Sequence, residues 1–173
     1  RVFDPALGKM HKQILALMNA GLGLLPTPQM KRDYLNFYGN LMKLSDSYLV
    51  EILDTLQDEE LLDDTIIIRT ADHGEMGLTH GGQRQKNFNF YEETIRVPLV
   101  YSNPRFYPKP YTSQALVSHV DFLPTLAALF GAPESARSSW QGVDYSELVL
   151  GRSAEPVQDY VVITYDDFQS GQS

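Results

Sequence analysis

The segment that most limits the possible folds is a run of mainly β-branched residues at 65–70, which leads directly into Asp72, His73 and Gly74. Such a run is typical of a strand that is buried in a helix-flanked sheet. A polar cluster just past the carboxyl end of a central strand is also where open α/β sheets bind ligands. We therefore expect a strand over 65–70 and a candidate site in the loop that follows it.

Further patterns predict a layered fold around that strand. Apolar residues recur at three- and four-residue steps over 29–56, which predicts a long helix with one face on the sheet. We expect a second strand at 96–101, a second helix at 118–130 and a last strand at 160–165. This order of elements predicts an α/β fold in which helices flank a layered sheet.

Composition excludes several classes of function. The formal net charge of −8 argues against nucleic acid as a partner, because phosphates favour basic surfaces. No apolar run approaches the roughly 18–20 residues that span a bilayer, so no membrane partner is expected. The chain has no cysteine, which rules out disulfides, thiolate metal ligands and a cysteine nucleophile within it.

Asp72 and His73 are the candidate metal ligands. A carboxylate oxygen and an imidazole nitrogen on adjacent residues, where the chain turns at Gly74, could both reach one divalent cation. The triplet alone fits an alternative equally well, in which Asp72 caps the following turn and His73 is satisfied locally. Spacing by itself does not choose between these interpretations.

Three more polar residues follow on a glycine-bearing loop. His80 and Lys86 could present an imidazole and an ammonium group to a tetrahedral oxyanion beside the metal. Lys86 could instead be an ordinary exposed lysine. Arg84 is expected, from its position alone, to be a surface arginine.

The order and spacing of these residues resemble the sulfatases of the alkaline phosphatase superfamily. The similarity extends over about 34–151 and is most specific between Asp72 and Pro98. The segments that carry it are 34–46, 61–65, 70–77, His80-Gly81, Lys86, 91–99, 118–126 and 140–144.

This resemblance implies roles for individual residues. Asp72 and His73 would be two ligands of the catalytic divalent ion, calcium by preference, with magnesium or manganese as alternatives. Lys86 matches the lysine that bridges the sulfate and the nucleophile, and His80 falls at the sulfate pocket. Arg84 takes no role from the family. Asp121 and Thr125 are better interpreted as helix-start residues than as catalytic ones.

The family's nucleophile is not found in this sequence. Sulfatases of this kind use a formylglycine made in a Cys/Ser-x-Pro-x-Arg motif, and no such motif occurs here. The aspartate pair that completes the family's metal site is also missing. We therefore expect an internal or C-terminal portion of a larger sulfatase, with the formylglycine in the missing segment, and an isolated chain that is inactive.

The expected organisation is a single partial sulfatase catalytic domain over 1–173. Residues 1–29 would be an irregular lead-in with short helical periodicity at 11–18. A metal-site core of helix, strand, loop, strand and helix would occupy 30–131. The loop and last strand would occupy 132–173.

The expected activity is hydrolysis of a small sulfated substrate, which could be an aryl, choline or glycan sulfate, with the remainder of the sulfatase chain as partner. Two alternatives stay open: a phosphonate monoester or phosphodiester hydrolase of the same superfamily, and a non-catalytic structural module with this fold. The sequence does not choose among periplasmic, secreted and cytoplasmic locations.

Overall fold

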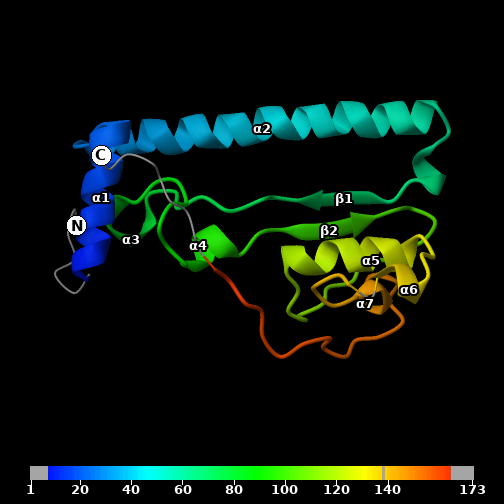
Figure 1. Cartoon of the computed structure of the whole chain (residues 1–173). Helices are drawn as coiled ribbons and strands as arrows, with labels where there is room; N and C mark the ends of the chain where they lie inside the picture. Colours follow the sequence, from blue (N-terminus) through cyan, green and yellow to red (C-terminus); the bar gives the residue numbers. More distant parts are fainter. Residues whose placement is uncertain (1–7, 138, 165–173) are drawn as a thin grey trace. The chain divides into compact units, whose positions relative to one another are not determined.

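The computed structural model describes residues 8–137 and 139–164 (Figure 1). The chain forms two compact units, Arg1–Val100 and Tyr101–Ser173. Within the described ranges it mixes helices with one small sheet of two strands, β1 (Ile67–Thr70) and β2 (Leu99–Ser102). Among these residues, no helix is both long and apolar enough to cross a membrane.

The longest element of the first unit is α2 (Pro28–Asp58), which confirms the helix predicted at 29–56. The Thr27 hydroxyl accepts a hydrogen bond from the Met30 backbone N–H at 3.2 Å, and Pro28 occupies the first helical position, so the start of the helix is capped. No residue of α2 is buried. Most of its large apolar side chains are exposed: Phe37, for example, is 65% exposed and Ile52 is 58% exposed.

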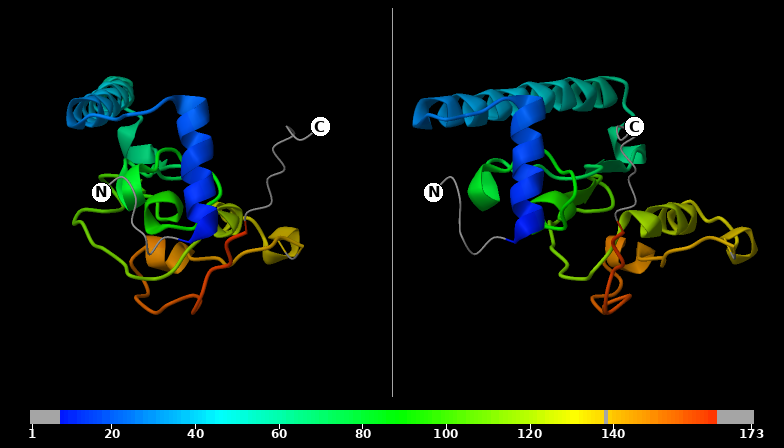
Figure 2. Two further views of the ribbon diagram at one scale, coloured as in Figure 1. Left: turned by 90° about the vertical axis from the view of Figure 1, so that its left-hand side faces the viewer. Right: turned by 60° about the vertical axis from the view of Figure 1, so that its left-hand side comes forward.

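The expectation that residues 1–29 are irregular is wrong for part of that range. Helix α1 covers Lys9–Leu22, and it crosses near the start of α2 (Figures 1 and 2). Ile14, Leu15 and Met18 are buried. Because these residues recur at helical spacing on one face, their burial stabilises a helix longer than the short periodic stretch indicates.

Strand β1 confirms a strand within 65–70, and β2 one that overlaps 96–101. The arrows of the two strands point in opposite directions in Figure 1, so the pair is antiparallel. The prediction of a buried strand is wrong for β1 in this structure, because its first two residues are half-buried and its last two exposed. A two-stranded sheet has too few neighbours to cover both of its faces.

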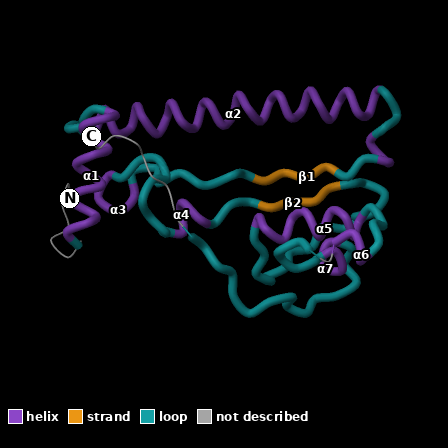
Figure 3. Tube along the Cα trace, viewed as in Figure 1, coloured by secondary structure: helices purple, strands orange, loops and turns teal. Residues whose placement is uncertain are grey.

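The segment between the strands is mostly loop (Figure 3). It contains a single-turn helix, α4 (Glu92–Ile95), and the four-residue segment α3 (Thr79–Gly82), in which His80 and Gly81 have left-handed backbone angles. A 3-10 turn at Leu62–Asp64 precedes β1.

The second unit is built around α5 (Phe122–Leu129), which a 3-10 turn at His119–Asp121 precedes, and two short helices, α6 (Glu134–Arg137) and α7 (Ser146–Val149). Together the 3-10 turn and α5 confirm the helix predicted at 118–130. Among the described residues of this unit, the buried apolar ones include Tyr145, Leu148 and Val149.

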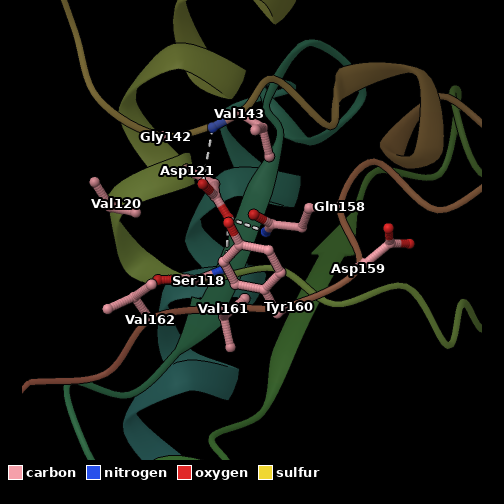
Figure 4. A pocket seen from close by; sticks show the side chains of 10 residues that line it. All are labelled: Ser118, Val120, Asp121, Gly142, Val143, Gln158, Asp159, Tyr160, Val161 and Val162. Atoms are coloured by element: carbon pink, nitrogen blue, oxygen red, sulfur yellow. Dashed lines mark hydrogen bonds between the residues drawn. The ribbon is translucent and has the colours of Figure 1, made fainter.

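Asp121 organises the start of α5. Its carboxylate accepts hydrogen bonds from the backbone N–H of Ser118 at 2.7 Å and of Val143 at 2.8 Å, and from the side-chain amide of Gln158 at 2.8 Å (Figure 4). The Thr125 hydroxyl donates to the Asp121 carbonyl and accepts from the Tyr145 backbone N–H. These contacts support the interpretation of both residues as helix-start residues.

The last strand predicted at 160–165 is wrong for its described part, because residues 160–164 form no strand; position 165 lies outside the described residues. These residues pass instead along a pocket of about 470 Å³ whose lining includes Asp121, Val143 and Tyr160 (Figure 4). β-branched residues favour an extended chain, but a strand also requires a neighbour for its backbone hydrogen bonds.

Candidate functional site

The Asp72 side chain lies at the surface just after β1. Its Oδ1 atom accepts a hydrogen bond from the His73 backbone N–H at 2.9 Å, so Asp72 does cap the turn that follows it. Its Oδ2 atom lies 3.4 Å from the His73 Nε2 atom, and the side chain is 85% exposed. The capping contact uses one oxygen and leaves the other facing the imidazole.

The His73 ring is fixed in one tautomer by its own neighbour. Its Nδ1 atom lies 2.9 Å from the Gly74 carbonyl oxygen. Because a carbonyl can only accept, Nδ1 must carry the proton, and a neutral ring then has its lone pair on Nε2. That lone pair faces the Lys86 ammonium group, which donates a hydrogen bond to it.

Gly74 is required here by a close approach of two backbone segments. Its N–H donates to the Thr94 carbonyl at 2.8 Å. A Cβ atom at this position would lie 1.9 Å from the Glu93 carbonyl oxygen, which no side chain tolerates. The glycine therefore lets the segment that carries Asp72 and His73 lie directly against α4.

The loop that carries Lys86 has an unusual backbone. Leu78, His80, Gln85 and Phe88 have φ values of 69°, 48°, 65° and 58°, in the left-handed region that favours glycine. Met76 in the same loop is fully buried, with a relative exposure of 0%. Surrounding packing thus holds the loop in a conformation that its residues do not prefer.

His80 is held against α4. Its Nε2 atom lies 3.1 and 3.2 Å from the two carboxylate oxygens of Glu93, and its ring stacks on Tyr91 at a centroid distance of 3.8 Å. The pKa of Glu93 is lowered, mainly because the backbone N–H of Glu93 donates a hydrogen bond to the Glu93 carboxylate. The hydrogen bond with His80 lowers this pKa further. These contacts orient His80, and its role in sulfate binding stays a prediction.

The expectation that Arg84 is a surface arginine is wrong, because Arg84 is only 4% exposed. Its guanidinium group donates to the carbonyl oxygens of Leu22 at 3.3 Å and Gly23 at 2.6 Å, and to the Asn19 side chain at 3.2 Å. These acceptors lie more than sixty residues earlier in the chain, so local spacing carried no signal of them. Arg84 ties the loop to the end of α1.

Sequence reasoning also missed Glu75. Its Oε1 atom accepts a hydrogen bond from the Tyr34 hydroxyl at 2.8 Å, which links the candidate site to α2. The available signal was an acidic residue directly after Asp72-His73-Gly74, in a segment that already contains the metal-ligand candidates.

The donor set at Asp72 and His73 fits part of a divalent metal site. Two donors that bind one cation at about 2.3 Å each and at a right angle lie about 3.3 Å apart, close to the observed 3.4 Å between Oδ2 and Nε2. The proton on Nδ1 leaves Nε2 as the coordinating nitrogen, as expected for a metal-ligating histidine. Within the described part of the chain, no group of three or more acidic or histidine side chains could hold a metal.

Comparisons with known proteins agree on one family. A family model described as Sulfatase matches residues 5–132. Arylsulfatase K of Gallus gallus is 36% identical over 107 residues, which are 62% of this chain and 19% of the relative. Choline-sulfatase of Rhizobium meliloti (strain 1021) is 36% identical over 129 residues, 73% of this chain and 24% of the relative. Arylsulfatase A of Homo sapiens is 35% identical over 131 residues, 70% of this chain and 25% of the relative. The chain therefore spans about a fifth to a quarter of the length of these curated relatives.

Proposed function

Because this chain belongs to the sulfatase family, we propose that it supplies the metal-binding and sulfate-binding part of an enzyme that hydrolyses sulfate esters. The observation that carries the proposal is the convergence of the Asp72 carboxylate, the His73 lone pair and the Lys86 ammonium group in one place. Such a set of groups can neutralise negative charge that develops on a sulfuryl group.

Asp72 and His73 would hold a divalent cation, calcium by preference and otherwise magnesium or manganese, and the bound ion would supply Lewis-acid stabilisation of sulfuryl oxygen charge. The His73 lone pair cannot serve both an ion and the Lys86 ammonium group. If His73 held an ion, Lys86 would need another acceptor, and we assign a sulfuryl oxygen to it. His80, held by Glu93 and Tyr91, would present its imidazole from the same loop.

The nucleophile and the remaining ligands are proposed to come from the remainder of a sulfatase chain, with a formylglycine as the attacking group. Two observations support a large additional partner. The match covers only 19–25% of the compared relatives. Most of the large apolar side chains of α2 are exposed, and an exposed apolar surface of this kind marks a site of contact with another part of a protein. We infer an incomplete alkaline phosphatase-like fold on the same grounds.

The proposed substrate is a small sulfate ester. The names of the compared relatives include arylsulfatases and a choline-sulfatase, and the chemistry above applies to either class. Phosphonate monoesters and phosphodiesters are the alternative, because a metal ion beside a lysine also neutralises a phosphoryl group.

The test uses the full-length protein and a matched pair of substrates, an aryl sulfate and the corresponding aryl phosphate diester. We expect kcat/KM to be higher for the sulfate ester. Replacing Lys86 with Ala should lower it by on the order of 100-fold, since a charge-stabilising donor is lost. Lys43, an exposed residue of α2, provides the control, and Lys43→Ala should retain the full rate. A higher rate on the phosphate diester, or a Lys86→Ala variant with the wild-type rate, would contradict the proposal.

A further inference from the structure

The Glu75 carboxylate collects hydrogen bonds from three separate parts of the first unit. Its Oε1 atom accepts from the Tyr34 hydroxyl at 2.8 Å, from the Gly77 backbone N–H at 3.2 Å and from the Gln85 backbone N–H at 3.0 Å. One oxygen therefore joins α2, the segment after His73 and the residue that directly precedes Lys86. An ionised carboxylate is a strong acceptor, so these are among the stronger contacts of the loop.

Gln85 is held at both of its backbone polar groups. Its N–H donates to Glu75, and its carbonyl accepts from the Met76 N–H at 3.1 Å. Its φ of 65° lies in the left-handed region, which a glutamine does not adopt without support. Since this backbone angle sets the direction in which the chain enters Lys86, the contact with Glu75 governs where the Lys86 side chain begins.

Tyr34 anchors this arrangement to α2. Burial, followed by the hydrogen bond to Glu75, raises the pKa of Tyr34 from 10.0 to about 12, so its hydroxyl keeps the donated proton even above pH 10. The Arg84 guanidinium group lies 6.0 Å from the centre of the Tyr34 ring and also binds the end of α1. Two helices thus support the short loop segment between Glu75 and Lys86.

We propose that Glu75 is a positioning residue that holds Lys86 beside His73, with Tyr34 as its anchor. The inference rests on the proposed function in one respect only, the role of Lys86 toward sulfate. The position of Lys86 can be measured without any substrate. Glu75 acts through the backbone of Gln85 and is not expected to touch the substrate.

The first measurement is the rate at which an amine-reactive acylating reagent modifies Lys86, compared with Lys43 of the same molecule as internal reference, by peptide mass spectrometry on the full-length protein. The Lys86 amine is half-buried and donates to His73, so it should react slowly in the wild type. Glu75→Ala should increase the Lys86/Lys43 ratio at least about threefold. Glu75→Gln keeps an oxygen acceptor at the same place and should restore most of the wild-type ratio. Tyr34→Phe, the mildest change, should give an intermediate ratio.

The second measurement is hydrolysis of an aryl sulfate by the same variants. Glu75→Ala should lower kcat about tenfold or more with a smaller change in KM, because misplacement of a charged group weakens transition-state stabilisation most. Glu51→Gln, on the exposed surface of α2, is the matched control and should match the wild type in both assays.

The two readouts separate the possible failures. If the wild type hydrolyses no sulfate ester while the labelling ratio still follows Glu75, the proposed function fails and the positioning role stands. If the wild type is active, and Glu75→Ala leaves both the labelling ratio and kcat unchanged, the positioning role is wrong. If Glu75→Ala lowers only the yield of folded protein, and folded Tyr34→Phe shows the wild-type labelling ratio and the wild-type kcat, Glu75 is merely structural and the proposal is also overturned.

Discussion

Replacing Asp121 with Asn tests how the second unit is held together. The carboxylate is 1% exposed, and it uses both oxygens: Oδ2 accepts from Ser118 and Gln158, and Oδ1 accepts from Val143. An asparagine has one oxygen and one NH₂ group. Whichever way the amide is turned, its NH₂ group must face at least one backbone N–H, so at least one hydrogen bond is lost and two donors are forced together.

The expected cost follows from these contacts. A hydrogen bond to a charged group contributes about 1.5–3 kcal/mol and a neutral one about 0.5–1.5 kcal/mol. Losing one charged bond should therefore lower the free energy of unfolding by about 1.5–3 kcal/mol, and weakening of the other two adds to this loss. With a urea dependence of about 1 kcal/mol per molar, the unfolding midpoint should fall by about 2 M or more.

Trp140 provides the assay. It is the one tryptophan of the chain and belongs to the second unit, so its fluorescence during urea unfolding reports on that unit. Asp159→Asn is the matched control, because Asp159 lines the same pocket and is exposed. If Asp121→Asn shifts the midpoint no more than Asp159→Asn does, the three hydrogen bonds do not stabilise the unit as argued.

Three further predictions concern the first unit. In chemical denaturation, Gly74→Ala should lower the free energy of unfolding by at least about 2 kcal/mol, because the new Cβ atom would overlap the Glu93 carbonyl oxygen. Gly39→Ala, on α2 with nothing near the new Cβ atom, should raise it by about 0.5–1 kcal/mol. Equal effects of the two changes would refute the close approach at Gly74. The raised pKa of Tyr34 contributes stability that is complete below pH 10 and is lost as the pH rises toward 12. In Tyr34→Phe, the free energy of unfolding should therefore fall less steeply with pH between 10 and 12, by the equivalent of up to one proton. The same slope in the variant and the wild type would contradict this prediction. Manganese binding can be measured by the paramagnetic broadening of amide signals near His73. The affinity should fall at least about tenfold in His73→Ala, and it should rise in Lys86→Met because that change frees the His73 Nε2 lone pair. The opposite order of affinities would contradict the assignment of His73 as a metal ligand.

Local patterns predicted the elements that depend on local interactions. The three- and four-residue steps of apolar side chains gave α2 almost to its ends, because helical hydrogen bonds join residues close in sequence. The helix predicted at 118–130 also depends on local contacts: Ser118 and Asp121 form a capping box at its start, and Gly131 follows its end with a positive φ of 72°. The candidate site was predictable to the extent that Asp72, His73 and Lys86 lie within fifteen residues of one another.

What depends on distant partners could not be predicted from those patterns. The β-branched run at 160–164 has the composition of a strand, but its described residues have no neighbour that would make it one. Arg84 donates a hydrogen bond to Asn19 of α1, and Glu75 accepts one from Tyr34 of α2. These partners lie 65 and 41 residues earlier in the chain. No spacing rule connects residues that far apart, so their burial and partners emerge only from the folded chain.

The left-handed residues of the loop at 78–88 have a consequence for engineering. Each of Leu78, Gln85 and Phe88 stores on the order of 1 kcal/mol of backbone strain, which glycine would release. A search for thermostable variants would therefore favour glycine at these positions, and each such change would also widen the range of directions open to Lys86. Selection for heat resistance and selection for turnover should thus move this loop in opposite directions.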